Sequence, residues 1–239
     1  MARPEGGPLV LMAPWQIALG LLLALALGFQ LFRRAATQTA VIRNYPSRLF
    51  AEAAPLLAQA EIGHGDTVGS YTLNGYYEGH PVRVKAVTDT LATRKLPSLW
   101  LMVTIPEPVP VRAVFDLMMR PAGIATFSNF DQLPYTLPHP TGFPDDAVIH
   151  TDDPAHCLPP TILAGHLKPF FGPRSKELLI TAKGLRLVSL LAEGDRLRYG
   201  VFRQASFGDV VLAAEHLRSS VLLLLALQAD IENWHKQTQ

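Results

Sequence analysis

Hydrophobic residues are spread unevenly along the chain, and the longest apolar stretch lies near the N-terminus. The 27 residues of Gly6–Phe32 carry no charge, and the run stops at Arg33 and Arg34. A helix needs ~20 mostly apolar residues to cross a bilayer, because each residue adds only ~1.5 Å to its length. The pattern therefore predicts one transmembrane helix over residues 9–32, after a short N-terminal tail of residues 1–8.

The flanks of this run favour a retained anchor over a cleaved signal peptide. Trp15 lies near one end, where aromatic rings prefer the membrane–water interface. A signal peptide has an apolar core of ~7–15 residues, followed by small residues at the cleavage site. Here the core is longer, and Arg33 and Arg34 stand where small neutral residues are needed.

The charges on the two sides of the predicted helix indicate its orientation. Before the helix stand only Arg3, offset in sign by Glu5, and the α-amine. After it no acidic residue occurs before Glu52, and four arginines are found there: Arg33, Arg34, Arg43 and Arg48. Because cytoplasmic flanks carry the excess of basic residues, we expect the remaining ~205 residues to lie in the cytoplasm.

A connector over residues 33–69 is expected to hold a short amphipathic helix. Its apolar residues recur at helical spacing: Leu49, Phe50, Ala53, Leu56, Leu57 and Ala60. Pro46 separates this helix from the membrane helix, and Pro55 kinks it or marks a restart. The apolar side can rest on the membrane surface or pack on the domain that follows, and we favour the second.

Strand patterns begin after the connector. Ser70–Tyr77 and His80–Asp89 flank a turn and predict a hairpin. Leu96–Ile105 is apolar on both alternating faces, which is typical of a central strand. The spacing of Val111, Val114, Phe115 and Met118 predicts a short helix before Pro121, and Ile124–Phe130 is expected to return as a strand.

The stretch Asp131–Pro160 holds seven prolines and predicts mostly irregular structure, with one short strand around Ala147–Thr151. Residues 176–182, 184–192 and 195–204 then predict a three-stranded meander. The last element expected is one long helix over Phe207–His235. Its inward residues, facing a core or a partner, are Val210, Leu217, Val221, Leu224 and Ile231.

Together these elements predict an α+β protein: a single N-terminal transmembrane helix, then an antiparallel sheet of six or seven strands packed against a long C-terminal helix. The soluble domain is expected over residues 70–239. In layout alone, strands closed by a long C-terminal helix are similar to helix-grip, lipid-binding domains. That resemblance implies a cavity for an apolar ligand between sheet and helix, although no sequence motif accompanies it.

Composition narrows the functional classes only slightly. The net charge is +1, which gives no electrostatic basis for nucleic-acid binding. The chain has one cysteine, so no intrachain disulfide forms. Frequent arginine, alanine and leucine are typical of GC-rich bacterial genomes, which suggests an inner-membrane location. Basic strand residues such as Arg186, Arg196 and Arg198 are interpreted as the solvated face of a sheet, with a cationic patch toward lipid headgroups as the alternative.

One segment carries residues of chemical interest. Two histidines, carboxylates and a thiol within eight residues are typical metal ligands, and the candidates are His150, Asp152, His156 and Cys157. Their spacing matches no established zinc signature, and Asp153-Pro154 is an ordinary turn starter, so an exposed turn is favoured. The chain has no Gly-X-Ser-X-Gly elbow and no phosphate-binding glycine loop, and no cofactor is expected.

The leading functional hypothesis is a non-catalytic, single-pass membrane protein that serves as an accessory or interaction subunit. Its expected partners are membrane lipids and either other subunits of a membrane complex or a second copy of itself. A lipid-binding module is the first alternative. A metal-dependent hydrolase that uses His150, Asp152 and His156 is the second.

Overall fold

The computed structural model describes Gln30, 45–67, 69–89, 96–121, Ala125, 127–138, 140–196 and 207–238. A folded unit starts at Pro46 and runs to the C-terminus. The membrane helix predicted over residues 9–32 lies outside the described residues except for Gln30. Within the described part of the chain, no helix has both the length and the hydrophobicity to cross a membrane.

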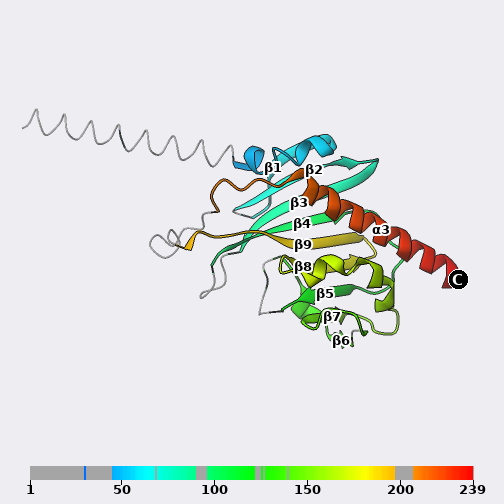
Figure 1. Ribbon diagram of the computed structural model, residues 1–239. Helices are drawn as coiled ribbons and strands as arrows, with labels where there is room; N and C mark the ends of the chain where they lie inside the picture. The colour runs from blue at the N-terminus through cyan, green and yellow to red at the C-terminus, as the bar shows by residue number, and fades with distance from the viewer. Residues whose placement is uncertain are drawn as a thin grey trace, which may run out of the picture. The chain divides into compact units, whose positions relative to one another are not determined.

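A nine-stranded antiparallel sheet with a C-terminal helix forms this unit (Figure 1). The α+β arrangement was predicted from the sequence, but with six or seven strands instead of nine. The strand order across the sheet is β1-β2-β3-β4-β9-β8-β5-β7-β6. The strands are β1 Ala58–His64, β2 Ser70–Tyr77, β3 His80–Asp89, β4 Ser98–Ile105, β5 Phe115–Met119, β6 Tyr135–Leu137, β7 Ala147–Thr151, β8 Ser175–Thr181 and β9 Gly184–Glu193. The helical elements are η1 Ala54–Leu56, η2 Phe130–Gln132, η3 Pro160–His166, η4 Lys168–Phe171 and α3 Ala214–Thr238.

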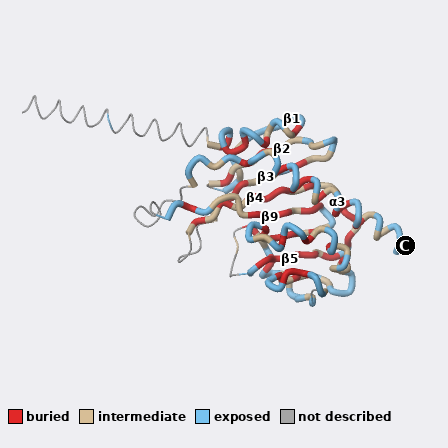
Figure 2. The backbone as a smooth tube through the Cα atoms, viewed as in Figure 1, coloured by how far each residue is buried: buried red, intermediate tan, exposed pale blue. Residues whose placement is uncertain are grey.

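The core lies between one face of the sheet and α3. On the central strand β4 the alternate residues Leu99, Leu101, Val103 and Ile105 are at most 1% exposed. Val103 pairs with Leu187 of β9, which places aliphatic side chains of neighbouring strands on one face. Figure 2 shows this burial concentrated on the middle strands of the sheet.

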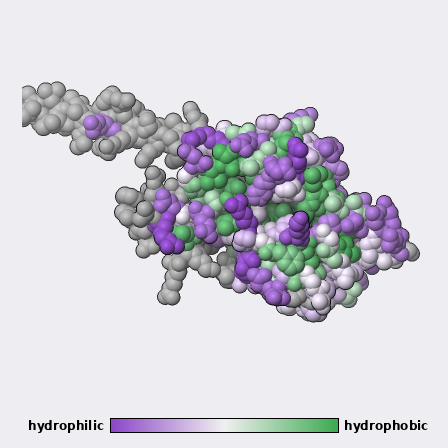
Figure 3. Space-filling model, in the orientation of Figure 1, coloured by the Kyte–Doolittle hydropathy of each residue, from purple (hydrophilic) through white to green (hydrophobic). Residues whose placement is uncertain are grey.

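α3 covers that face above β4 and β9. Five of its residues recur every three or four positions and are at most 1% exposed: Leu217, Val221, Leu224, Leu227 and Ile231. The last turn of the helix holds His235 and Lys236 and ends at Thr238, and Figure 3 shows the C-terminal end of the domain as hydrophilic. These five apolar residues of α3 are buried because the helix packs directly on the sheet.

The C-terminal helix begins at Ala214 rather than at the predicted Phe207. Gly208 has φ +66°, which no right-handed helix accommodates. The N–H of Leu212 donates to the carbonyl of Leu49 at 2.7 Å, outside the helix. Val210, predicted as an inward helix residue, is half-buried in this preceding segment, whereas the other four predicted residues lie on the buried stripe.

The connector packs on the domain, as we favoured from the sequence. Leu49, Phe50 and Ala53 are fully buried. The helical turn over residues 45–49 is followed by η1, and the chain then enters β1, which pairs with β2. A Cβ on Gly75 of β2 would lie 2.8 Å from the Cβ of Leu57, so glycine permits this close approach. The sheet thus begins at residue 58, inside the range that the sequence assigned to the connector.

Two local predictions between residues 111 and 130 are wrong. The segment expected as a short helix contains β5, in which all five residues are buried. A short apolar run carries no periodicity that separates a strand buried on both faces from a buried helix. The strand expected over Ile124–Phe130 is also absent, because its described residues form a turn that leads into η2. The strand predicted around Ala147–Thr151 is confirmed as β7, and that predicted over 195–204 lies mostly outside the described residues.

Candidate functional site

The sheet face opposite α3 buries two carboxyl groups. Asp116 of β5 is 2% exposed, and Glu177 of β8 is fully buried. In the strand register, Asp116 lies opposite Leu179, and Leu179 lies opposite Arg186 of β9. Glu177 precedes Leu179 by two positions, so it projects from the same face, diagonal to both Asp116 and Arg186. The register alone therefore brings two acids and one base together.

The contacts of this acid pair are incomplete. Arg186 Nη2 lies 3.5 Å from Glu177 Oε2, and the Ser128 hydroxyl donates to Glu177 Oε1. Asp116 Oδ1, Glu177 Oε2 and Arg186 Nε are buried and have no hydrogen-bond partner among the described residues. Buried charges without a full set of partners are costly, so this pair favours a state with less than two negative charges.

The protonation of the pair follows from its surroundings. Burial raises the pKa of Asp116 to about 8, the charge of Glu177 adds to the rise, and Arg186 opposes it. Burial also raises the pKa of Glu177, while Arg186 and the hydrogen bond from Ser128 oppose the rise. Because burial raises the pKa of both carboxyl groups and two charges here would repel each other, the pair favours a state that keeps a proton, and Arg186 balances the remaining negative charge.

A short segment covers this pair. Phe127 and Phe130 pack with Met102, Met118 and Val188 in one buried cluster. The ring of Phe130 stacks on His150 of β7, with centroids 3.9 Å apart and planes at 9°. His150 Nδ1 also lies 3.1 Å from the Phe130 carbonyl oxygen. The cover makes the acid pair an internal feature, where it can hold a proton and fix the covering segment but presents no exposed nucleophile.

A surface pocket of about 340 Å³ lies elsewhere on the domain. Its lining residues are Arg120, Phe143, Pro144, Asp145, Asp146, Phe170 and Phe171. Arg120 Nη1 lies 2.9 Å from Asp146 Oδ2. Arg120 Nη2 donates to the carbonyls of Pro173 and Ser175 at 3.2 and 3.1 Å. One arginine thus ties together the chain segments that border the pocket.

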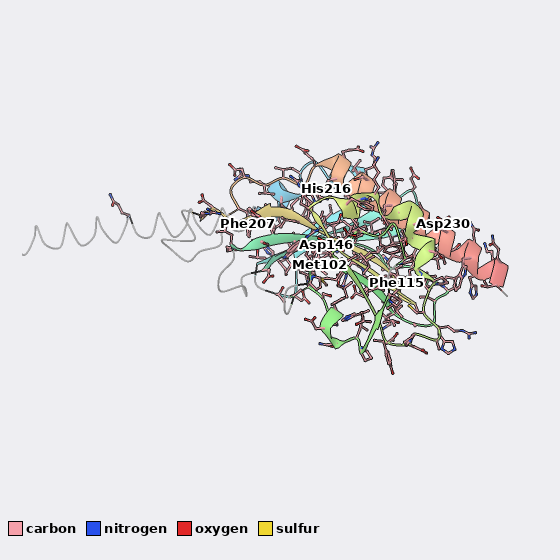
Figure 4. The ribbon with its side chains drawn as sticks, turned by 60° about the horizontal axis from the view of Figure 1, so that its bottom comes forward. Met102, Phe115, Asp146, Phe207, His216 and Asp230 are labelled. Atoms are coloured by element: carbon pink, nitrogen blue, oxygen red, sulfur yellow. The ribbon has the colours of Figure 1, made fainter. Side chains whose placement is uncertain are left out.

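Polar contacts also join α3 to the rest of the domain. His216 Nε2 lies 3.2 Å from the Ser189 hydroxyl of β9, and His166 Nε2 lies 2.8 Å from Asp230. His216 and Asp230 are labelled on α3 in Figure 4. Burial lowers the pKa of His216, so this ring is neutral at pH 7. Because Ser189 is only 5% exposed and lies beneath the helix, the serine–histidine pair positions α3 and is closed to a substrate.

The four residues predicted as weak metal candidates have separate contacts. His150 contacts Phe130, and Asp152 accepts a hydrogen bond from the Val114 N–H at 2.7 Å. His156 pairs with Asp153 at 2.7 Å, and Cys157 Sγ lies 3.9 Å from the Val114 carbonyl. Within the described ranges no three histidine, cysteine, aspartate or glutamate side chains are grouped so that they could hold a metal ion. The segment forms a turn stabilised by Asp153, whose side chain accepts from the Ala155 N–H.

The predicted membrane-flanking residues Trp15, Arg33 and Arg34 lie outside the described residues. The sequence reasoning missed the acid pair and the pocket. Part of the signal for the acid pair was present, since Asp116 is a single acid inside the apolar run "VFDLMM", whereas Glu177 stands beside Lys176 at the start of "ELLI". Arg186, interpreted as solvated, instead pairs with Glu177 and has a side chain only 23% exposed. The pocket had no signal, because its residues come from three separate stretches of sequence.

Comparison of the chain with protein-family models, with curated proteins and with solved structures found no match.

Proposed function

We propose that this protein is a single-pass membrane protein whose folded domain acts without catalysis, as an interaction or accessory subunit beside a membrane complex. The uncharged run over residues 9–32 supplies the anchor in this proposal. The arginines that follow it favour the cytoplasmic side for the folded domain, and a composition typical of GC-rich bacterial genomes favours the inner membrane.

The observation that carries the proposal is the packing of the juxtamembrane segment. Leu49, Phe50 and Ala53 are fully buried, so the folded unit starts close behind the predicted anchor. Only residues 33–45 lie between them, about 13 residues that span at most ~45 Å when fully extended. A domain on so short a connection remains at the membrane surface, where its effective concentration toward other membrane proteins is high.

The polar chemistry is consistent with a non-catalytic role. The acid pair is enclosed under Phe127 and Phe130, and the Ser189–His216 pair lies under α3. Catalysis requires reacting groups that a substrate can reach, and neither arrangement provides them. The exposed side chains of the pocket, by contrast, are available to another molecule.

The anchor is tested on the full chain by membrane fractionation and alkaline carbonate extraction. We expect the native protein to stay in the membrane pellet, and the double variant Leu21→Arg, Leu23→Arg to be released. Two carboxyl-terminal fusions test the orientation. A fusion to green fluorescent protein should fluoresce, and a fusion to alkaline phosphatase, which becomes active only after export, should stay inactive. Release of the native chain by carbonate would contradict the proposal.

The accessory role is tested by gentle detergent extraction of the full chain, affinity capture and mass spectrometry of proteins and lipids together. A stoichiometric membrane-protein partner is the expected result. Recovery of the chain alone with one defined lipid would instead support a lipid-binding module.

A further inference from the structure

Three unusual features coincide at the surface pocket. First, the domain is hollowed there by about 340 Å³. Second, Phe171 on its rim is 65% exposed, the highest value among the exposed large hydrophobic side chains of the described residues. Third, Arg120 adopts φ +47°, a left-handed conformation that is unfavourable for a residue with a side chain. Backbone strain of this kind persists where the surrounding contacts impose it, often at binding sites.

The contacts of Arg120 make the pocket rigid before any ligand arrives. Its N–H donates to the Asp146 carbonyl at 2.9 Å, and its guanidinium bonds the Asp146 carboxylate and two carbonyls, as described above. Phe170, Phe143 and Pro144 are buried and form an apolar floor. A rigid, preformed pocket loses little conformational freedom on binding, so even a small ligand group gains affinity there.

The charge balance of the lining identifies the ligand class. The guanidinium of Arg120 is already neutralised by Asp146 and occupied by carbonyl oxygens. Asp145 is exposed, and among the described contacts its carboxylate has no partner. Lys168 and Arg174 flank the Phe170–Phe171 pair in sequence, but neither lines the pocket. The unpaired charge of the lining is therefore negative, and an exposed aromatic ring lines the same pocket.

We propose that this pocket binds an arginine or lysine side chain presented by a partner protein. The aliphatic stem of that side chain packs on the ring of Phe171 and the apolar floor, and its cationic group pairs with Asp145. An exposed aromatic ring and a carboxylate together attract a cation through its interaction with the ring face and through charge. This inference rests on the proposed interaction function and specifies the chemistry of its partner.

The test uses the full chain in detergent micelles, with three short capped peptides as probes: Gly-Arg-Gly, Gly-Lys-Gly and Gly-Glu-Gly. Saturation-transfer NMR measures their binding. We expect the two basic peptides to bind in the millimolar range and the acidic peptide not to bind. Asp145→Asn and Phe171→Ala should each weaken the basic peptides roughly fivefold, since each removes one of the two attractive contacts.

Matched controls separate the pocket from general surface effects. Asp131→Asn removes an exposed aspartate elsewhere, and Leu222→Ala removes an apolar side chain that is 46% exposed on α3. Neither should change peptide binding. Equal binding of the acidic peptide, or equal losses in the controls and the pocket variants, would overturn the proposal.

The experiments distinguish a failure of the pocket proposal from a failure of the proposed interaction function. If affinity capture of the full chain recovers a stoichiometric partner that Asp145→Asn and Phe171→Ala leave unchanged, the pocket proposal is wrong and the accessory role stands. If carbonate releases the native chain, the membrane role fails, while the peptide measurement still reports on the pocket. If sedimentation shows that the chain self-associates and both pocket variants abolish this self-association, the pocket binds a second copy of the chain. That result would overturn the proposal for a separate partner.

Discussion

The two faces of the sheet achieve burial by different means. The face beneath α3 is aliphatic along β4, and the helix completes it with a stripe that is at most 1% exposed. The opposite face places Asp116, Glu177 and Arg186 among Met102, Met118 and Val188 under a short irregular cover. The first face is stabilised chiefly by apolar area, which any well-packed aliphatic set supplies. The second depends on particular partners and on one proton, so its stability responds to single charges and to pH.

The largest loss of stability is expected from a substitution on the aliphatic face. Leu224→Asp places a carboxylate on the fully buried side of α3, which costs both the apolar contact and the desolvation of a charge. We expect destabilisation by more than about 4 kcal/mol, and the domain should not fold. Circular dichroism and thermal melting check this.

Leu222→Asp is the matched control, since Leu222 lies two positions away on the exposed side of the same helix. It should melt close to the parent. A cooperative melt of Leu224→Asp near that of the parent would show that the helix stripe contributes little to the core.

The next largest loss of stability is expected from a substitution on the charged face. Arg186→Met keeps much of the side-chain volume but leaves Glu177 without its cation. Removal of one member of a buried ion pair costs about 3 kcal/mol, because the other charge stays buried. Urea unfolding measures the loss, and Arg218→Met on the exposed side of α3 serves as the control. Equal stability of the two variants would mean that the acid pair is already neutral without Arg186.

The two faces should also differ in pH dependence. In the folded state the pKa of Asp116 is raised to about 8, whereas in the unfolded chain it lies near its usual value of 3.8. The stabilising proton is therefore fully effective below pH 3.8, and its contribution is lost as the pH rises to about 8. Asp116→Asn keeps a neutral group at this position at every pH, so it should gain stability over the parent as the pH increases.

Urea unfolding from pH 5 to pH 9 compares Asp116→Asn with the parent, and the difference between the two curves reports the titration of the Asp116–Glu177 pair, because each group shifts the pKa of the other. Glu177, Arg186 and His150 surround Asp116 in the strand register and are unchanged in both proteins. A difference that is constant with pH would show that Asp116 is ionised throughout. Asp131→Asn should show no such trend.

The smallest effect tests the junction between the juxtamembrane segment and the sheet. Gly75→Ala brings a Cβ to 2.8 Å from that of Leu57 and 2.9 Å from the Ala58 carbonyl oxygen. Overpacking of this kind costs about 1–2 kcal/mol. Gly165→Ala is the control, because nothing lies within 4 Å of its added Cβ. Equal melting temperatures would indicate that residues 57 and 58 shift away freely.

The sequence predicted the aliphatic face better than the charged one. Ser70–Tyr77 and His80–Asp89 were predicted with the bounds that β2 and β3 have, because alternation and a glycine turn mark them locally. β5 was missed, since a short run buried on both sides has no period of its own. Asp116, Glu177 and Arg186 lie on three strands that meet only in the assembled register, so no local pattern reports their proximity. The pocket likewise depends on tertiary arrangement.

One contact near the start of the folded unit has a mechanical consequence. The Leu212 N–H bonds the Leu49 carbonyl, and Arg48 pairs with Asp209 at 2.7 Å, so the segment that enters the sheet is joined to the segment that leads into α3. A force applied to the chain ahead of Pro46 therefore acts on this hydrogen bond and this ion pair before it reaches the edge strand β1. These two contacts, the buried Phe50 and the first turn of α3 bear the force together. The hydrogen bonds between β1 and β2 are therefore not broken one after another from the end of β1.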